Sequence, residues 1–523
     1  MKLQVLWRHN GNICETSEYD VACGMLLLHA LQQNGYMLHA VCGGNAFCGK
    51  CLVEVKDKGM VYACKTPVTE DMVVYLEQEA PYQILAAPVS EISPACPLDR
   101  VGIVIDIGTT TLVFALVAVR GRRVVGNHAM LNGQIALGTD VISRIQAANQ
   151  GKGELLRKRI QNDLQEGIQT LLKNHHLTLE CVEQVVLAGN TLMCHFLLGY
   201  PCEGLGKSPF QPYCTKMQKG ELSRLLDWEA GEAVAYTILP SIAAFVGADV
   251  VAGMYHCGFH HVKAPGMYMD IGTNGELALC LENRIYVTSV AAGPAFEGGN
   301  ISCGTGSVQG AVSDVSVYKI SQLYQTSMDN GEGLGKRYFI GPYVIELQTI
   351  LDAEPIGICG TGIVSLIAEL RKNHIVDRQG MLQENYRERG FPIAQTKNNR
   401  TICVTQKDIR EFQMAKAALR AGIDCLLSAC KLSLADVSCV FLAGGFGHYM
   451  NMEKAMDIGM LPAEWSGKIV SLGNASLQGT MDCMVKEGGL SECENIVKSC
   501  KEMILAKEPE FSTQYMKYMD LCR

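Results

Sequence analysis

The sequence predicts a multidomain protein of the α/β and α+β classes, in which a small cysteine-bearing β domain precedes a larger, duplicated α/β domain. Three observations predict this arrangement. The chain has 523 residues, which is too long for one hydrophobic core. Cysteines are closely spaced between residues 42 and 64, and the tetrapeptide Asp-Ile-Gly-Thr occurs at 106–109 and again at 270–273. We expect four parts, which span residues 1–68, 69–100, 101–265 and 266–523.

The composition excludes several classes of protein. Hydrophobic residues make up 48% of the chain and charged residues 19%, a globular balance that leaves no room for a large disordered part. The net charge of −8 argues against a nucleic-acid surface. The N-terminus lacks the apolar stretch of a signal peptide, and the most apolar segment, 101–119, is interrupted by Asp106 and by threonines. We therefore expect a cytoplasmic protein that binds neither nucleic acid nor membranes.

The chain is rich in cysteine. In a reducing compartment most of its 23 cysteines should be thiols or metal ligands. For isolated ones such as Cys194 and Cys439 we expect small buried hydrophobic side chains. So many thiols are easiest to maintain without oxygen, which favours an anaerobic host.

The closely spaced cysteines follow the pattern C-x5-C-x2-C-x12-C at Cys42, Cys48, Cys51 and Cys64. Structural zinc sites usually consist of two C-x2-C pairs separated by a knuckle. Here glycines are interleaved with the first three cysteines, which allows backbone N–H groups to approach bound sulfurs. The pattern favours an iron–sulfur cluster, with zinc binding and a purely structural role as alternatives.

The surroundings of this loop predict a β-grasp domain. A hairpin is expected from residues 2–9 and a segment near Ile13, followed by a helix over 22–34. The segments LVEV and VYAC after the loop are expected as short strands. The loop resembles that of the 2Fe–2S ferredoxin family, which implies that the four cysteines bind a 2Fe–2S cluster. The twelve residues between Cys51 and Cys64 are fewer than that family normally has.

Residues 67–99 are acidic and then proline-bearing, which predicts a linker and a domain boundary near residue 100. Beyond it the chain repeats itself. The segments 103–117 and 267–281 each contain an apolar strand, the Asp-Ile-Gly-Thr turn and a second strand. Later in each half, 185–193 and 440–450 contain an apolar strand that ends in a glycine turn. The order is the same in both halves, so we predict the duplication of one α/β unit.

A turn of the form Asp-x-Gly-Thr places N–H groups and hydroxyls around phosphate oxygens, and its carboxylate can hold Mg²⁺ or the waters of Mg²⁺. Two facing copies would clamp a nucleotide in the cleft between the halves. The glycines at 444, 445 and 447 follow a buried strand, the usual place for a base and ribose. Gly360 lies in another glycine turn, for which a simple tight turn is the alternative. Asp249 and Glu297 are further candidate carboxylates, with helix capping as the alternative.

The region from residue 101 onward resembles the acetate and sugar kinase, heat-shock-70 and actin superfamily. This resemblance implies a duplicated actin-like (ribonuclease H-like) ATPase domain. It contains no GxxxxGK[ST] loop. Together with the cysteine loop, segments such as DIGTTTL, AGNTLMCHFLLG, AAGPAFEGGNI, GICGTGI and GNASL resemble the reductive activators of corrinoid-dependent enzymes. Larger members of that family have an additional domain in the linker region.

The resemblance implies an ATP-dependent activity. In that family the cluster accepts an electron from a cellular electron donor and passes it to an inactive Co(II) corrinoid protein, which restores the Co(I) needed for methyl transfer. The step is uphill, so nucleotide binding and hydrolysis are coupled to it. The expected cofactors are therefore a 2Fe–2S cluster and ATP with Mg²⁺, and the expected partner is a corrinoid protein, with a homodimer left open.

The resemblance also implies roles for individual residues. The candidate catalytic carboxylates are Asp106, Asp270, Asp249 and Glu297. The candidate nucleotide-binding residues are Gly108, Thr109, Thr110, Thr111, Gly272, Thr273, Asn274, Gly360, Gly444, Gly445 and Gly447. His195 lies in the AGNTLMCH segment and is expected either to help bind the partner or to be a buried structural histidine.

Three other functions are kept as hypotheses. The chain could drive electrons into a non-corrinoid acceptor, as the activators of radical dehydratases do, although those bridge a cluster between two subunits. It could be a small-molecule kinase with an accessory ferredoxin domain. It could also be a redox-sensing protein that binds ATP without turnover.

Overall fold

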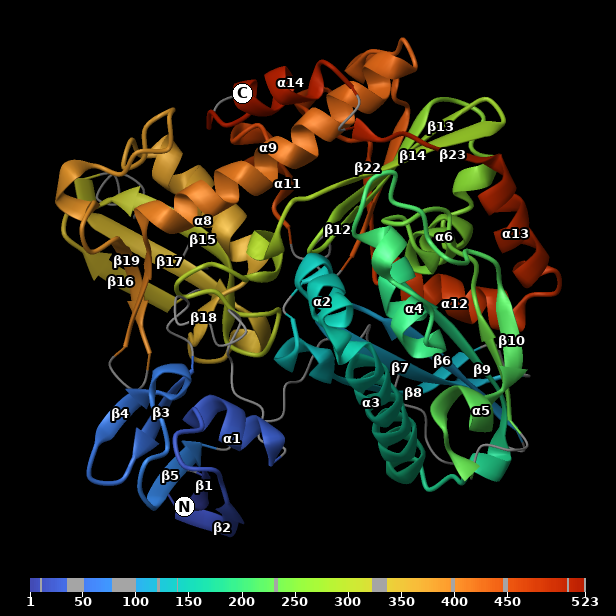
Figure 1. Ribbon diagram of the computed structural model, residues 1–523. Coiled ribbons are helices and arrows are strands. Elements are labelled where there is room, and N and C mark those ends of the chain that lie inside the picture. Colours follow the sequence, from blue (N-terminus) through green and yellow to red (C-terminus); the bar gives the residue numbers. More distant parts are fainter. Residues whose placement is uncertain are drawn as a thin grey trace.

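The computed structural model describes residues 1–9, 12–34, 51–77, 100–119, 123–138, 140–229, 234–321, 336–396, 400–444, 450–505 and 508–521. A small N-terminal sheet is followed by two six-stranded sheets and, within the second half, by a four-stranded sheet (Figure 1). The predicted fold class, a β-grasp domain followed by a duplicated α/β domain, is confirmed.

The N-terminal domain is a five-stranded sheet of order β2-β1-β5-β3-β4 with one helix. Strands β1 and β5 are parallel, and each outer neighbour is antiparallel. Leu3, Val5, Leu27 and Val74 are completely buried between the sheet and the helix. The elements are β1 (Lys2–His9), β2 (Asn12–Asp20), α1 (Leu27–Gln33), β3 (Leu52–Val55), β4 (Gly59–Tyr62), the 3₁₀ turn η1 (Ala63–Lys65) and β5 (Met72–Glu77).

Three expectations for this domain need correction. Strand β5 lies inside the expected linker, so the domain extends at least to Glu77 rather than ending at residue 68. The acidic residues around this segment favoured a linker in the sequence, whereas in the structure the segment is the parallel partner of β1. The helix begins at Leu27 rather than residue 22, because Gly24 has a positive φ of 83° and Leu26 forms a bridge with Pro67. The segment VYAC is only half strand, since Cys64 lies in η1.

The first half of the large domain is a sheet of order β10-β11-β9-β6-β7-β8. Strands β6, β7 and β8 form an antiparallel meander, and β9 and β11 add parallel strands beside β6. The outer face packs on α3 and α4 through residues such as Phe114, Ile160 and Leu164. The strands are β6 (Val101–Ile107), β7 (Thr111–Ala118), β8 (Arg123–Leu131), β9 (Val182–Gly189), β10 (Gln218–Glu221) and β11 (Ala235–Ile238). The helices are α2 (Val141–Ala147), α3 (Gly153–Asn174), α4 (Thr191–Leu198) and α5 (Leu222–Leu226).

The second half repeats this topology in a sheet of order β22-β21-β12-β13-β14-β23. Strands β12, β13 and β14 form the equivalent meander, and β21 and β22 are the equivalent parallel strands. The predicted duplication is therefore present as two sheets of the same design. The strands are β12 (Gly266–Ile271), β13 (Gly275–Leu281), β14 (Arg284–Val290), β21 (Cys439–Ala443), β22 (Ile469–Gly473) and β23 (Cys500–Glu502).

A subdomain is inserted between β14 and α9, which makes the second half the longer one (Figure 1). Its sheet has the order β16-β17-β15-β18, with a separate β19–β20 hairpin. Its elements are β15 (Ala311–Lys319), β16 (Lys336–Ile340), β17 (Tyr343–Thr349), β18 (Gly357–Ile358), α8 (Gly360–Lys372), β19 (Phe391–Gln395) and β20 (Thr401–Val404). The remaining helices are α6 (Ala248–His256), α9 (Gln406–Ala429), α11 (Met452–Asp457), α12 (Ala475–Val485), α13 (Gly489–Ser499) and α14 (Phe511–Lys517).

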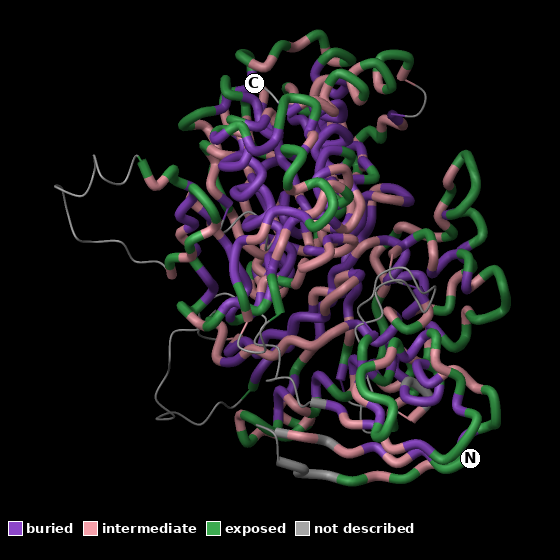
Figure 2. Tube along the Cα trace, turned by 90° about the vertical axis from the view of Figure 1, so that its left-hand side faces the viewer, coloured by how far each residue is buried: buried purple, intermediate pink, exposed green. Residues whose placement is uncertain are grey.

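Helices α6 and α12 pack between the two large sheets. Their buried residues form one hydrophobic cluster with Val104 and Val186 of the first sheet and Tyr268 and Ala278 of the second. Figure 2 shows buried residues running through the interior of the large domain and exposed residues at its periphery. The halves are thus joined by a continuous core below the turns that carry the predicted site. None of the helices in the described ranges is long and apolar enough to cross a membrane.

Gly479 allows α12 to approach α6 closely. A Cβ atom on this residue would lie 1.9 Å from the carbonyl oxygen of Ala252, a backbone atom that cannot move aside easily. We expect Gly479→Ala to destabilise the large domain by about 2 kcal/mol, because the two helices would have to separate. The matched control is Gly153→Ala at the start of α3, where the new methyl group would find only the Ala148 side chain at 4.0 Å. Thermal unfolding of both variants tests this, and an equal melting temperature in the two would contradict it.

Candidate functional site

The two Asp-Ile-Gly-Thr turns occupy equivalent places in the two sheets. Asp106 lies near the end of β6 beside Ala188 of β9, and Asp270 lies near the end of β12 beside Ala443 of β21. In each turn the glycine N–H closes the loop by donating to a backbone oxygen, at 2.9 Å from Gly108 to Thr111 and 2.9 Å from Gly272 to Asn274. A Cβ atom on Gly108 would lie 2.6 Å from that Thr111 oxygen, so only glycine fits.

Glu297 joins the two turns. Its Oε2 atom accepts hydrogen bonds from Thr110 Oγ1 at 3.0 Å and from Thr273 Oγ1 at 2.6 Å. Glu297 ends the 3₁₀ turn η8 (Pro294–Glu297), which follows β14. The Asp-Ile-Gly-Thr turns of the two halves therefore face each other across the Glu297 carboxylate. Helix capping, the alternative role for Glu297, does not explain these contacts.

The N-terminus of α12 closes the cleft over Asp106. Asn474 Nδ2 donates to one carboxylate oxygen at 3.0 Å and Ser476 Oγ donates to the other at 2.8 Å. Asn474 also caps the helix by accepting from Leu477 N–H at 2.8 Å. The segment GNASL does not by itself predict these two contacts, because the bond from Asn474 to Asp106 joins positions 368 residues apart.

Carboxylates are crowded around Asp270. Burial and the charge of Asp106 raise the pKa of Asp270 to about 7, opposed by a hydrogen bond from Tyr268. Burial and the charges of Asp270 and Asp106 raise the pKa of Asp249, in the first turn of α6, to about 8. Burial, Asp249 and Asp270 raise the pKa of Glu276 well above its usual value. Glu276 lies directly opposite Asp270 on β13, a cross-strand relation that sequence reasoning missed.

Buried polar side chains hold the first turn in shape. Arg144 of α2 is completely buried, and its guanidinium donates to the Thr109 carbonyl at 2.6 Å and to the Gly138 carbonyl at 2.8 Å. Asn132, also completely buried, donates to the Gly108 carbonyl at 2.9 Å. Burial lowers the pKa of Arg144 to about 10, opposed by nearby acidic residues that include Glu297. Arg144 and Asn132 were not predicted as site residues, because a lone Arg or Asn in a helix or turn has no sequence signature.

The crowded carboxylates predict a pH-dependent response to Mg²⁺. The folded-state pKa values of Asp270 and Asp249, about 7 and about 8, lie above the ordinary value of 3.8. At pH values between the ordinary and the raised pKa, the folded protein therefore binds more protons than the unfolded chain. Stability without Mg²⁺ should therefore fall as the pH rises from about 4 to about 8. Mg²⁺ favours the ionised carboxylates, so we expect it to raise the melting temperature more at about pH 8.5 than at about pH 6.

The control for this prediction is Asp249→Asn, which removes one titrating carboxylate and should weaken the pH dependence. Differential scanning fluorimetry with and without Mg²⁺ provides the measurement. An equal effect of Mg²⁺ at both pH values would contradict the prediction.

The other predicted nucleotide residues have different positions. Gly444 has a φ of +91°, and a Cβ atom there would lie 3.0 Å from Asp270 Oδ1, so its backbone lies directly beside the second turn. Gly445 and Gly447 lie outside the described residues. Gly360 is buried at the start of α8, which packs beside η8. Gly362, two residues further along α8, packs so closely that a Cβ atom would lie 2.1 Å from the Val312 carbonyl oxygen. This glycine cluster therefore allows α8 to pack closely against β15.

His195 is buried within the first half of the large domain. Its Nε2 accepts from the Tyr213 N–H at 3.2 Å, so Nδ1 carries the proton and donates to the Thr191 carbonyl at 2.7 Å. The side chain is only 1% exposed, and burial lowers its pKa. These contacts favour the structural role over partner binding.

Two of the four predicted cluster cysteines lie in the described residues. Cys51 and Cys64 are buried thiols next to each other, and the Cys64 N–H donates to Cys51 Sγ at 3.5 Å. Two buried thiols and an N–H···S bond between these two residues fit the donor set of an iron–sulfur cluster. Cys42 and Cys48 lie outside the described residues.

The isolated cysteines differ from each other. Cys194 is buried, as expected, and burial raises its pKa. Cys439 is only partly buried at the start of β21, so the expectation of a fully buried side chain is wrong for it. It lies opposite Gly266 of the neighbouring strand β12, where a Cβ atom would come within 3.1 Å of its sulfur.

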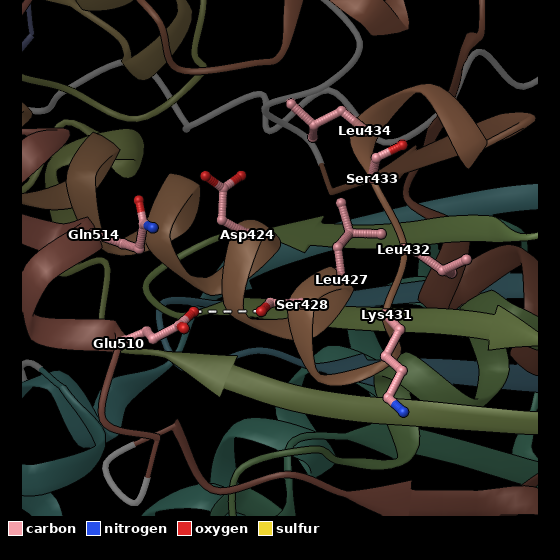
Figure 3. A pocket seen from close by; sticks show the side chains of 9 residues that line it. All are labelled: Asp424, Leu427, Ser428, Lys431, Leu432, Ser433, Leu434, Glu510 and Gln514. Atoms are coloured by element: carbon pink, nitrogen blue, oxygen red, sulfur yellow. Dashed lines mark hydrogen bonds between the residues drawn. The ribbon is translucent and has the colours of Figure 1, made fainter.

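A surface pocket lies elsewhere (Figure 3). Residues of α9, of the segment after it and of α14 line it, and none of the predicted site residues is among them. Two of its acidic residues are already paired, since Glu510 accepts from Ser428 at 3.3 Å and Asp424 from Arg420 at 3.3 Å. Within the described parts of the chain, no three His, Cys, Asp or Glu side chains are arranged to ligate a metal directly.

Comparisons with known proteins agree with this architecture. Residues 14–79 match a 2Fe–2S iron–sulfur cluster binding domain, residues 101–262 match the RACo middle region, and residues 264–523 match the C-terminal domain of RACo, the ASKHA domain. The first match includes β5, in agreement with the corrected extent of the N-terminal domain.

Three known proteins are similar to this chain over half of its length or more. The corrinoid activation enzyme RamQ of Eubacterium limosum is 28% identical, over 95% of this chain and 96% of its own length. The [Co(II) methylated amine-specific corrinoid protein] reductase of Methanosarcina barkeri is 29% identical, over 53% of this chain and 50% of its own length. The solved structure of a reductive activator for a corrinoid, iron–sulfur protein has a TM-score of 0.72 and 25% identity, covering 99% of this chain and 98% of its own. Because two adjoining models of one family account for most of the chain, it belongs to the RACo family, with a 2Fe–2S domain before its ASKHA domain.

Proposed function

We propose that this protein is an ATP-dependent reductive activator that passes an electron from a cellular donor, by way of its 2Fe–2S domain, to the Co(II) cofactor of a corrinoid protein. The product is the Co(I) state that methyl transfer requires. One observation supports this proposal above the others: a cluster-type cysteine pair and a two-sided nucleotide cleft, closed by Glu297, occur in one chain. The relatives of similar length are named for corrinoid activation.

In the N-terminal domain, Cys42, Cys48, Cys51 and Cys64 are the proposed cluster ligands. A bound 2Fe–2S cluster supplies reversible one-electron storage. The chain's own contribution is to hold the sulfurs and exclude water. Cys51 and Cys64 are 1% and 6% exposed and lie in the domain core with Val53 and Ala63. The Cys64 N–H stabilises negative charge on the Cys51 sulfur, which tunes the potential of the site.

In the large domain, the proposed phosphate ligands are Gly108, Thr109, Thr110 and Thr111 of the first turn and Gly272, Thr273 and Asn274 of the second. Asp106 and Asp270 are the proposed carboxylates for the waters of Mg²⁺, with Asp249 and Glu276 behind them. The proposed binding residues for the adenosine part of the nucleotide are Gly444, Gly445 and Gly447. Gly360 begins α8, a helix that packs beside η8, so we propose that it acts in the cleft through the loop of Glu297.

Glu297 gives the cleft a means to couple nucleotide binding to movement. Its carboxylate accepts hydrogen bonds from the hydroxyls of Thr110 and Thr273. A triphosphate between the turns would need these hydroxyls and would repel the carboxylate, so binding should displace Glu297. Because the halves share the α6–α12 core, a change at the turns can shift one half against the other.

The test of the proposal is formation of Co(I). With a chemical reductant, MgATP and a cognate Co(II) corrinoid protein, we expect the corrinoid absorption spectrum to change to that of Co(I). Omission of ATP should slow the reaction by about 10-fold or more, because the transfer is uphill without it. A non-hydrolysable ATP analogue is the control that separates binding from hydrolysis. ATP-dependent reduction of another acceptor, with every cognate corrinoid protein left as Co(II), would contradict the proposal.

A further inference from the structure

We propose that Cys303 and Cys403 form a dithiol that low-molecular-weight disulfides oxidise reversibly to a disulfide bond, and that this bond fixes the loop that carries Glu297. The first part stands independently of the function proposed above. The second part rests on the cleft being the nucleotide site.

The two cysteines come together from separate elements. Cys303 lies in the loop after η8, and Cys403 lies in β20. The Cys403 N–H donates to Cys303 Sγ at 3.5 Å, which places the Cys303 sulfur against the backbone of Cys403. The neighbours Ile402 and Val404 are each 1% exposed, so alternation along the strand turns Cys403 away from the core. Both thiols are partly exposed and therefore accessible to a small reagent.

The surroundings make Cys303 the nucleophile of the pair. Hydrogen bonds from Cys403, among them the one from its backbone N–H, and the charge of Arg400 lower the pKa of Cys303, against burial and the charge of Asp408. The same coupling, together with burial, raises the pKa of Cys403. A thiolate beside a protonated thiol is the arrangement that attacks a disulfide and then resolves the product.

The reaction balances in two exchange steps. The Cys303 thiolate attacks one sulfur of the small disulfide, forms a mixed disulfide and releases the first thiolate. The Cys403 thiol loses its proton to water and attacks Cys303 Sγ, which forms the internal disulfide and releases the second thiolate. Counted from the Cys303 thiolate and the Cys403 thiol, the protein loses two electrons and one proton, and the small disulfide is reduced to two thiolates.

A short, tightly packed loop connects this pair to Glu297. Gly304 follows Cys303 and packs on Gly298, where a Cβ atom on Gly304 would lie 2.0 Å from the Gly298 carbonyl oxygen. Gly298 directly follows Glu297. The Cys303 carbonyl accepts from the Ile358 N–H at 2.8 Å, and the Ser302 N–H donates to Asp408 at 2.7 Å. A disulfide would add a covalent bond from this loop to β20 and hold Glu297 between the turns.

A second pair of thiols provides the internal control. Cys483 of α12 and Cys493 of α13 have their sulfurs 3.0 Å apart, but they are only 3% and 0% exposed. Their mutual hydrogen bond and burial raise the pKa of Cys483. Access and thiolate character therefore distinguish Cys303 and Cys403 from this buried pair.

The first experiment maps disulfides in the full-length protein. The anaerobic protein is treated with oxidised glutathione, free thiols are alkylated, and the disulfide-linked peptides are identified by mass spectrometry. We expect a Cys303–Cys403 linkage that a dithiol reductant removes, with Cys483 and Cys493 alkylated only after denaturation. Free thiols at both positions, or a mixed disulfide on Cys303 without the internal bond, would overturn the proposal.

The second experiment measures the affinity for a fluorescent ATP analogue before and after oxidation. A fixed Glu297 would compete with phosphate for the threonine hydroxyls, so we expect oxidation to weaken binding about 5-fold or more. Cys403→Ser should abolish the effect, and Cys483→Ser should retain it. A mapped disulfide with unchanged affinity would overturn the second part. Failure of the reduced protein to bind the analogue would instead contradict the proposed function.

Discussion

Asp106→Asn and Asp270→Asn are each expected to lower the rate of ATP hydrolysis about 100-fold or more, because each removes a preorganised charge beside the proposed Mg²⁺. The two residues occupy equivalent places in the two halves, at the ends of β6 and β12. Asparagine has nearly the same volume as aspartate, so the turns should keep their shape. The measurement is phosphate release by anaerobic full-length protein at saturating MgATP.

The matched control is Asp227→Asn, which changes an exposed aspartate after α5 in a left-handed conformation that asparagine adopts readily. Its hydrolysis rate should equal that of the unmodified protein. Iron content should be the same in all three variants, because the cysteines are untouched. Normal hydrolysis by both cleft variants would contradict the assignment of the paired turns.

Cys51→Ala is expected to remove the cluster and with it all formation of Co(I), while ATP binding remains. The anaerobic unmodified protein should contain about two irons and two sulfides per chain and give a reducible S = 1/2 signal. The variant should lose both, since a three-sulfur set no longer completes the cluster. Its affinity for ATP should stay the same, because Cys51 belongs to the hydrophobic cluster of the N-terminal domain.

Cys194→Ala is the control for this variant, since Cys194 is a buried cysteine of α4 whose thiol contacts the Gly189 carbonyl. It should retain full iron and sulfide content and full cobalt reduction. Stoichiometric zinc without sulfide in the unmodified protein would contradict the cluster assignment. Undiminished cobalt reduction by Cys51→Ala would contradict electron delivery through this domain.

Local patterns in the sequence were sufficient for several features. The alternation in residues 2–9 predicted β1, because one face of a half-buried strand must be apolar. The repeated Asp-Ile-Gly-Thr turns predicted two equivalent sheets, because a duplicated unit repeats its turn chemistry. The crowding of cysteines between 42 and 64 predicted the iron–sulfur domain that the family match also identifies. Each of these signals lies within a short stretch of chain.

Features that depend on distant contacts were not predictable in this way. Strand β5 was placed in a linker, because its identity depends on pairing with β1 about 70 residues earlier. Asn474 and Ser476 reach Asp106 only when α12 packs between the sheets. Glu276 became a site residue through its register with Asp270, which no periodicity predicts.

The sequence alone determined the domain types and their order, the duplication, and the two turns with their carboxylates, because glycine turns and strand periodicity act over a few residues. Only the tertiary structure decided which side chains complete the cleft. Glu297 could equally have capped a helix, and its contacts with Thr110 and Thr273 join residues 187 and 24 positions apart. The Cys303–Cys403 pair, separated by 100 positions, is of the same kind. Hydrogen bonds and charge interactions act over a few ångströms in space, so they become visible only when the chain has folded.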